Sequence, residues 1–249
     1  MFLVSAFHNA RKINSFVFNI KNMKRLFLQI PFLFLVSYSF SQTLSHITLS
    51  GGATLSSFSF LTNQKVIIKI SPEGKVLEWG TELAPGRLGY YPGKLEPYID
   101  RVTYYGQEVD SAYRGNVKSI GTCYLTYYGS LENKSQIGKI KMIGSVALEY
   151  FDNFENQEFR GKLKFVSNQM LSYYTSSENE SYRGKLKSVG STQLSYYSSF
   201  DDILIRGKIK SIGPVTYTWY TSFEISRYHG GLKSGTLSQS INGIIYYIR

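Results

Sequence analysis

The sequence has little cysteine, histidine or tryptophan, and these shortages exclude several classes of protein. Its single cysteine, Cys123, leaves no partner for an intramolecular disulfide. The three histidines, His8, His46 and His229, do not lie at the spacing of metal ligands, and no nucleophile-elbow or phosphate-binding glycine pattern is present. We therefore expect no catalytic residues, no metal site and no cofactor, and hence a protein that is not an enzyme.

Acidic residues are absent from the first 41 positions, and this region also holds the main apolar run. Residues 23–41 contain a basic pair, then eleven largely apolar residues, then serines at positions −3 and −1 of a cleavage site before Gln42. The run is too short to span a bilayer, so it predicts a signal peptide. Residues 1–22 are interpreted as an over-extended gene start, with a long basic region or an uncut anchor as alternatives. The protein is therefore expected to be exported, as a periplasmic, cell-surface or secreted protein.

Positive charge is modest once the predicted signal peptide is set aside. The full chain has a net charge of +11, and without the five basic residues of positions 1–41 it has 23 Lys and Arg against 17 Asp and Glu, a net of +6. This balance permits an anionic partner without requiring one. Together with export, it makes a nucleic-acid partner unexpected.

Aromatic residues and glycine are abundant, with 21 Tyr, 16 Phe and 22 Gly. This composition favours strands over helices. The dominant pattern is a repeat, because one glycine recurs every 23 residues. The recurring glycines are Gly115, Gly138, Gly161, Gly184, Gly207 and Gly230.

The five complete repeats, numbered from this glycine as position 0, have the same chemical order. Position +2 is apolar, +3 is Lys, +6 is usually Gly, +10 is usually Leu, +12 and +13 are aromatic and +17 is acidic. Two short alternating runs separated by turns predict one β-hairpin per repeat. The predicted fold is all-β, an elongated antiparallel meander of tandem hairpins, with a β-solenoid as the alternative. A meander is favoured because it places the repeated lysines about 9.6 Å apart rather than about 4.8 Å.

Side-chain alternation predicts two unlike faces. Pairing +4 with +10 and +2 with +12 puts +2, +10 and +12 on an apolar face, and −1, +1, +3 and +13 on a basic and aromatic face. The aliphatic +5 position then falls on the basic face, which calls for a bulge or a second small cluster. The acidic +17 row is assigned to solvated turns rather than to calcium sites.

The basic and aromatic face is the candidate binding site. Lysine ammonium groups beside tyrosine rings suit an anionic glycan, and a solvated face of lysine stems on tyrosine rings is the alternative. The candidate residues are Lys141, Lys164, Lys187, Lys210, Tyr174, Tyr197 and Tyr220.

Flanking segments complete the predicted organisation. Residues 42–112 contain degenerate copies of the repeat, such as Gly93-Lys94-Leu95, and are expected to form a β cap that closes the array. Residues 113–249 hold the tandem repeats and end in a second cap. One elongated domain is expected.

The opening of the repeat resembles a known family. Tyr182-Arg183-Gly184-Lys185-Leu186 and Tyr113-Arg114-Gly115-Asn116-Val117 are similar to the first half of the membrane occupation and recognition nexus (MORN) repeat, also 23 residues long. The likeness covers about residues 113–234. It implies an elongated single-layer sheet with scaffold or membrane-surface roles. The second half of the motif departs, with Leu-x-Tyr-Tyr in place of a glycine-rich segment, so no binding residues are transferred.

These features together predict an exported, non-catalytic β-repeat scaffold or cell-surface interaction module. Its partner is unknown, and an anionic glycan, the envelope surface and another protein are all compatible. Two alternatives are an outer-membrane β-barrel, which solubility without detergent would contradict, and a polysaccharide-active hydrolase, which an activity screen would detect.

Overall fold

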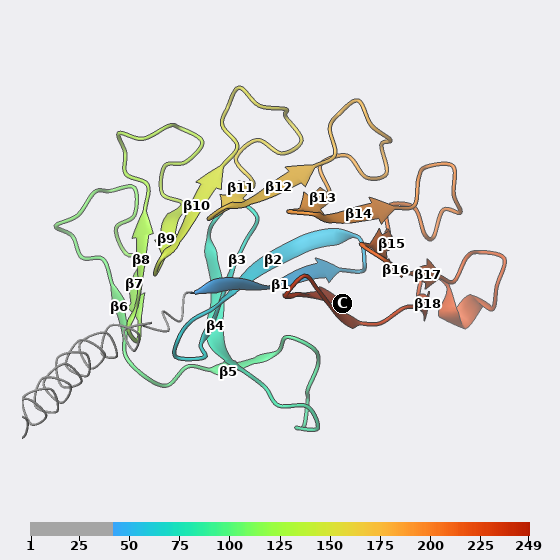
Figure 1. Ribbon diagram of the computed structural model, residues 1–249, viewed down its shortest axis with the longest axis horizontal. Helices are drawn as coiled ribbons and strands as arrows, with labels where there is room; N and C mark the ends of the chain where they lie inside the picture. Colours follow the sequence, from blue (N-terminus) through green and yellow to red (C-terminus); the bar gives the residue numbers. More distant parts are fainter. Residues whose placement is uncertain (1–41) are drawn as a thin grey trace, which may run out of the picture. The chain divides into compact units, whose positions relative to one another are not determined.

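The computed structural model describes residues 42–249, and nearly all of their regular structure is β-strand (Figure 1). The predicted signal peptide and the predicted over-extended gene start lie outside the described residues. Among those described, the only helix is a short 3₁₀ turn, η1 (Ser226–Tyr228). Strands make up 43% of the positions, fewer than a pure run of hairpins would give, because each repeat also contains a long loop.

The strands form three sheets. The seven-stranded sheet has the order β19-β20-β1-β2-β3-β4-β5 and the eleven-stranded sheet runs from β6 to β16 in chain order. Strands of the first sheet are β1 (Thr43–Ser50), β2 (Thr54–Leu61), β3 (Ile67–Ile70), β4 (Val76–Glu82), β5 (Leu95–Pro97), β19 (Ser238–Ile241) and β20 (Ile244–Ile248). Strands of the second are β6 (Val102–Tyr104), β7 (Val117–Ile120), β8 (Cys123–Tyr127), β9 (Ile140–Ile143), β10 (Val146–Tyr150), β11 (Leu163–Val166), β12 (Gln169–Tyr173), β13 (Leu186–Val189), β14 (Thr192–Tyr196), β15 (Ile209–Ile212) and β16 (Val215–Thr216). A small third sheet pairs β17 (Thr218–Trp219) with β18 (Leu232–Ser234).

The eleven-stranded sheet confirms the predicted all-β antiparallel meander. Every strand in it pairs only with its neighbours in sequence, and its two end strands, β6 and β16, lie on opposite edges. Each repeat contributes a hairpin whose strands span positions +2 to +5 and +8 to +12. A long loop from +13 to +1 then leads to the next hairpin.

The hairpin register differs by one residue from the predicted pairing. Val189 pairs with Thr192, so +5 lies opposite +8 and the turn has only two residues. The first of these, such as Gly190, has a φ of 55°, which is the left-handed region that a two-residue hairpin needs. The predicted pairing of +4 with +10 is therefore wrong, because the turn is tighter than the sequence pattern indicated.

A bulge between neighbouring repeats restores the predicted apolar face. Tyr196 pairs with Ile209 and Ser195 with Ser211, which leaves Lys210 as the extra residue at position +3. The same register shift recurs from repeat to repeat. Positions +2 and +5 therefore point the same way, and +5 joins +2, +10 and +12 in the core. The buried +5 side chains are Ile120, Ile143, Val166, Val189 and Ile212.

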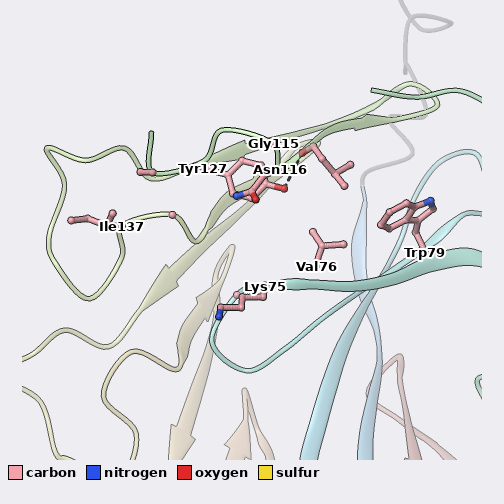
Figure 2. Close-up of a pocket in the computed structure, with 11 residues that line it drawn as sticks. Lys75, Val76, Trp79, Gly115, Asn116, Tyr127 and Ile137 are labelled. Carbon is pink, nitrogen blue, oxygen red and sulfur yellow. Dashed lines mark hydrogen bonds between the residues drawn. The ribbon is translucent and has the colours of Figure 1, made fainter. Parts of the chain in front are cut away.

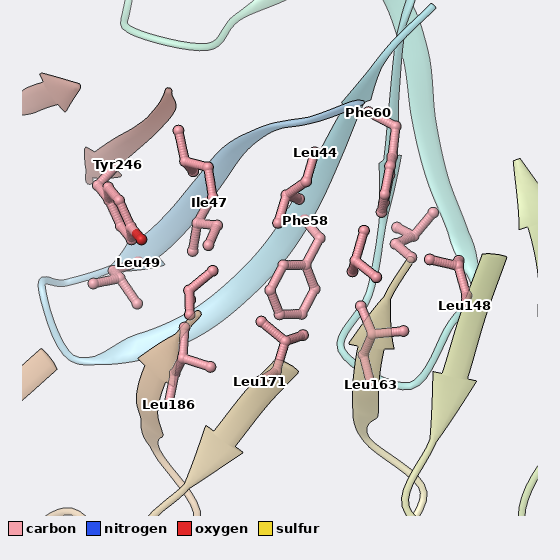
Figure 3. Packing of buried hydrophobic residues seen from close by; sticks show 14 of the residues in the cluster. Leu44, Ile47, Leu49, Phe58, Phe60, Leu148, Leu163, Leu171, Leu186 and Tyr246 are labelled. Carbon is pink, nitrogen blue, oxygen red and sulfur yellow. The ribbon is translucent and has the colours of Figure 1, made fainter. Parts of the chain in front are cut away.

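The seven-stranded sheet covers the apolar face of the array and forms one core with it (Figure 3). Phe58 from this sheet lies beside Leu171 from the repeats, and Ile47 and Leu186 belong to the same core. The sequence predicts a cap at the end of the array, whereas β1 to β5 lie across its face. The C-terminal segment also leaves the array, because β20 pairs in parallel with β1. A sheet with one apolar face requires such a cover, since an end cap would leave that face in water.

Two glycine turns of the covering sheet dock on the array. Gly52, between β1 and β2, lies against Trp219, and Gly74, between β3 and β4, lies against Tyr150, both at position +12. The Gly74 carbonyl accepts a hydrogen bond from the Ile140 amide at 3.2 Å. Equivalent bonds run from the Leu163 amide to Pro72 and from the Ile209 amide to Gly52. The backbone amides at position +2 thus anchor the covering sheet.

We expect Leu186→Ala to lower the free energy of unfolding by about 2–5 kcal/mol, because Leu186 is fully buried and its loss leaves a cavity. Lys187→Ala, at the adjacent and partly exposed position, should cost about 1 kcal/mol or less. Denaturant unfolding of both variants measures the difference. Equal losses would show that the faces are assigned wrongly.

Gly74→Ala should loosen the contact between the two sheets. Gly74 has a φ of 81°, and a Cβ there would overlap the Tyr150 ring, so the turn must move away from the array. Hydrogen exchange should show faster exchange of the Ile140 amide in this variant. Gly86→Ala is the control, because Gly86 also has a positive φ but no atom lies where its Cβ would be. Similar exchange in both variants would contradict this docking role.

Candidate functional site

The structure brings the predicted basic and aromatic residues together in one regular row. Each +3 lysine lies over the +13 aromatic ring of the preceding repeat, with its ammonium 5.1–5.7 Å from the ring centroid. The pairs are Lys141 and Tyr128, Lys164 and Phe151, Lys187 and Tyr174, Lys210 and Tyr197, and Lys233 and Tyr220. Such contacts stabilise an ammonium by about 0.5–1 kcal/mol at exposed sites.

Most of these lysines also have an acidic partner. The +3 ammonium bonds the +17 glutamate of the preceding repeat, as Lys187 does with Glu178 at 2.9 Å. The others are Lys141 with Glu132, Lys164 with Glu155 and Lys233 with Glu224. Burial acts to raise the pKa of Glu178, but hydrogen bonds from Lys187 and Thr175 lower it overall. The acidic row therefore serves to neutralise the lysine row.

The +13 tyrosines tie neighbouring repeats together through their hydroxyls. Tyr174 donates to the Leu194 carbonyl at 2.8 Å and Tyr197 donates to the Tyr217 carbonyl at 3.0 Å. Their rings are half-buried, and Tyr174 also packs on Tyr182. Because rings, ammonium groups and carboxylates already have partners within the chain, this face has little free charge to offer a ligand.

A second lysine row, which sequence reasoning placed on the same face, lies at position +1. Each of these ammonium groups lies over the +12 ring of its own repeat, at the edge of the array that the covering sheet meets. The pairs are Lys139 and Tyr150, Lys162 and Tyr173, Lys185 and Tyr196, and Lys208 and Trp219. Burial lowers the pKa of all four lysines. The +12 side chains are fixed in turn, because each donates to the +2 carbonyl of its repeat, as Tyr196 does to Leu186.

A cavity of about 580 Å³ opens beside the first complete repeat (Figure 2). Tyr127 and Asn116 of the array lie across it from Val76 and Trp79 of β4. Lys75 lies at its rim. The cavity therefore lies between the array and the covering sheet.

The long loops present a row of exposed apolar side chains that sequence reasoning missed. Position +16 lies inside a β-turn in which the +17 amide donates to the +14 carbonyl. Four of its side chains, in repeats one, two, four and five, are more than 90% exposed: Leu131, Phe154, Phe200 and Phe223. The signal was visible in the sequence, because three phenylalanines and a leucine recur in the 23-residue register, with Ser177 in the third repeat, in segments otherwise rich in Ser, Asn and Glu.

Hydrogen bonds brace these loops against one another. The +18 side chain of one loop bonds the +15 residue of the next, as Asn179 does with Ser199 at 2.9 Å. Asn156 bonds Ser176 in the same way, and Ser222 donates to Asp202. The exposed +16 side chains are therefore held in a fixed row on a rigid support.

A buried polar cluster on the outer face of the covering sheet contains residue types found in catalytic sites. His46 stacks on Tyr247, and its Nε2 lies 3.9 Å from a Glu82 oxygen. Tyr247 donates to Glu82 at 2.6 Å. Ser45 Oγ lies 2.9 Å from His46 Nδ1 and 3.0 Å from the Ser59 carbonyl oxygen. Because the hydroxyl has one proton, a hydrogen bond to this carbonyl competes with proton transfer to the imidazole.

The remaining titratable groups also suit packing better than chemistry. Lys69 bonds Glu78 and the Gly93 carbonyl, both at 2.8 Å. Burial raises the pKa of the Cys123 thiol to about 11, so the unreactive protonated form is present at neutral pH. Within residues 42–249, no group of three or more His, Cys, Asp or Glu side chains could hold a metal ion.

The buried imidazole predicts a pH dependence of stability. Burial lowers the pKa of His46, with Lys69 acting in the same direction and Glu82 against it. The folded state therefore favours neutral His46, and stability present above the ordinary pKa of 6.5 is lost as the pH falls below it. His46→Gln should flatten the fall in unfolding free energy between about pH 7 and pH 5. His229→Gln, at an exposed site, is the control variant. A flattening in the control and not in His46→Gln would contradict the assignment.

Comparison with known proteins gives no match. No protein-family model, no curated protein and no solved structure matches it. Among the described residues, no helix has both the length and the apolar character needed to cross a membrane. The resemblance to the 23-residue MORN repeat therefore stays a prediction.

Proposed function

We propose that this chain is an exported, non-catalytic interaction module that binds a partner protein along its row of apolar loop tips. The observation that carries the proposal is the row itself, Leu131, Phe154, Phe200 and Phe223, which lies in solvent on braced loops. Single exposed apolar residues are ordinary, but a repeated row of them is typical of a binding surface.

The spacing of the row supports a protein partner. Corresponding positions in adjacent repeats are separated by two strands, or about 9.6 Å, so several tips can contact one extended surface. Aromatic side chains on a rigid support lose little conformational entropy on binding and are typical anchors of protein interfaces. The loops between them carry Ser and Asn groups that can form the polar rim of such an interface.

The lysine–aromatic face is a weaker candidate for a binding surface than the row of loop tips. An anionic glycan would have to displace the glutamates that already bond Lys141, Lys164 and Lys187. Exposed pairs of this kind contribute about 0–1 kcal/mol each, so displacement is cheap but brings little gain. We therefore assign this face to stabilising the array, and the loop row to binding.

Absence of catalysis is supported by the arrangement of the polar residues. In the cluster around His46, a hydrogen bond from the Ser45 hydroxyl to the Ser59 carbonyl competes with proton transfer to the imidazole. Export is supported by the predicted signal peptide alone, and the single buried cysteine is compatible with an oxidising compartment.

The test is site-specific photocrosslinking in the cells that make the protein. A benzophenone amino acid placed at 154, 200 or 223 should crosslink the same protein from all three positions. The control position is Ala147, which is exposed on β10 rather than on a loop tip. Serine at the two unlabelled phenylalanines should reduce crosslinking at the third by about thirtyfold, because each anchor contributes about 1 kcal/mol and two are removed.

The outcomes separate the candidate partners. Crosslinks to lipid alone would assign the row to the envelope surface and overturn the protein partner. Crosslinks that do not depend on the neighbouring phenylalanines, or that appear equally from position 147, would show that the row is not a binding surface. Retention of the purified protein by an anionic polysaccharide, lost on Lys164→Gln, would favour the lysine–aromatic face instead.

A further inference from the structure

The array itself shows what fills the space beside a +12 ring. In each of the four repeats after the first, a lysine at position +1 crosses the ring and its ammonium lies 4.4–5.7 Å from the centroid. The ammonium then donates to a backbone carbonyl. The acceptor is the position 0 glycine of the next repeat for Lys139, Lys162 and Lys208, and Ala53 of the covering sheet for Lys185.

The first repeat has the same ring and the same glycine but lacks the lysine. Tyr127 occupies position +12 and donates to the Val117 carbonyl at 2.9 Å, as the later rings do in their repeats. Position +1 is Asn116, whose side chain has one methylene and cannot span the ring to Gly138. None of the cation–ring contacts found in residues 42–249 involves Tyr127.

The cavity of about 580 Å³ occupies this position. Its lining includes Asn116, Tyr127 and Gly138, the three members of the incomplete set, with Val76 and Trp79 on the opposite side (Figure 2). Val76 and Trp79 provide an apolar wall for an alkyl stem. The space is larger than one lysine side chain, so it also admits the backbone that carries it.

We infer that this cavity is a binding site for the ammonium group of a lysine side chain supplied by another protein. The ammonium lies over Tyr127 and donates to the Gly138 carbonyl, which reproduces the contacts of the four internal lysines. The site is separate from the row of apolar loop tips and does not depend on it.

Backbone geometry favours a lysine in a polypeptide over a free amine. The +2 amides of the second, third and fifth repeats donate to carbonyls of the turns that lie beside the internal lysines. Within residues 42–249, no hydrogen bond joins a turn of the covering sheet to the amide of Val117, the +2 residue of the first repeat, and the same holds for Leu186 of the fourth. A partner segment that carries the lysine can place one of its own carbonyls there.

Charges around the cavity offset one another. Glu73 and Lys75 belong to the turn that borders the cavity, and they act in opposite directions on the pKa of Lys139, with the effect of Glu73 the larger. The turn therefore does not repel an incoming ammonium as an isolated Lys75 would.

The experiment uses residues 42–249 as a folded unit and a blocked pentapeptide, Gly-Gly-Lys-Gly-Gly, as the probe. Amide NMR signals of Asn116, Val117 and Gly138 should shift saturably with the peptide. The peptide with norleucine in place of lysine should bind at least about tenfold more weakly, because it keeps the stem and loses the charge. n-Butylamine, which has the ammonium and stem without a backbone, should also bind more weakly.

Asn116→Lys supplies the missing lysine from within the chain. It should reduce lysine-peptide binding to the norleucine level and raise the melting temperature. Thr126→Lys is the matched control, since it adds the same charge at an exposed position on the same strand as Tyr127 and should preserve binding. Saturable shifts that lysine and norleucine peptides cause equally, or no saturable shifts, would overturn the proposal. Equal binding of n-butylamine would assign the site to free amines instead of a partner protein.

Discussion

A one-residue bulge in every repeat decides where almost all side chains of the array point. Without it, the strand from +2 to +5 would alternate strictly, and the +5 aliphatic residue would face solvent. With Lys210 bulged out in the fifth repeat, Ile209 and Ile212 both reach the core. The bulged residue itself must then lie outside, and lysine, with a long stem and a charged end, suits that position.

The bulge also explains the hydrogen bonds along the edge of the array that meets the covering sheet. The amide and carbonyl of the +2 residue bond to groups outside the strand pairing, because leaving a buried amide or carbonyl unpaired costs free energy of folding. The carbonyl receives the +12 hydroxyl of the same repeat, as in Tyr173 to Leu163, or the Trp219 indole N–H. The amide is met, in three repeats, by a carbonyl from a turn of the covering sheet. One local irregularity thus creates both the need for a second sheet and the contacts that hold it.

Sequence analysis could predict the meander and the buried face because both follow from a repeated pattern. Leu186, Leu194 and Tyr196 are buried as the period of two predicts. It could not predict the register, since a turn one residue shorter combined with a bulge places +2, +10 and +12 on one face, as the longer turn without a bulge does. It also could not place β1 to β5, because long-range packing between the array and a non-repeating segment leaves no periodic signal.

The candidate site residues were predicted only in part, because the repeated pattern shows which residues share a face but not their long-range contacts. The lysines and tyrosines of the basic face do lie together. The glutamate partners of the lysines come from the preceding repeat, and only the folded structure shows that these two positions are in contact. The apolar residues at +16 recur with the period of the repeat. They lie, however, in segments whose Ser, Asn and Glu content already indicates turns, so the apolar position was not singled out. Asn116 replaces the lysine found at position +1 of the next four repeats. This single difference gains meaning only from the structure, which shows that the lysine lies over the +12 ring.

A repeat array that satisfies its own charges has few places at which to act on another molecule. In the regular part of each unit, ammonium groups lie on rings, hydroxyls meet carbonyls and apolar residues meet the covering sheet. Binding capacity is therefore expected where this internal pairing stops. At the loop tips it stops because the phenylalanines at +16 are more than 90% exposed. At Asn116 it stops because the Tyr127 ring and the Gly138 carbonyl keep their geometry while the lysine that would join them is missing. Both features use the rigidity of the surrounding repeats, which holds each site in shape before any partner arrives.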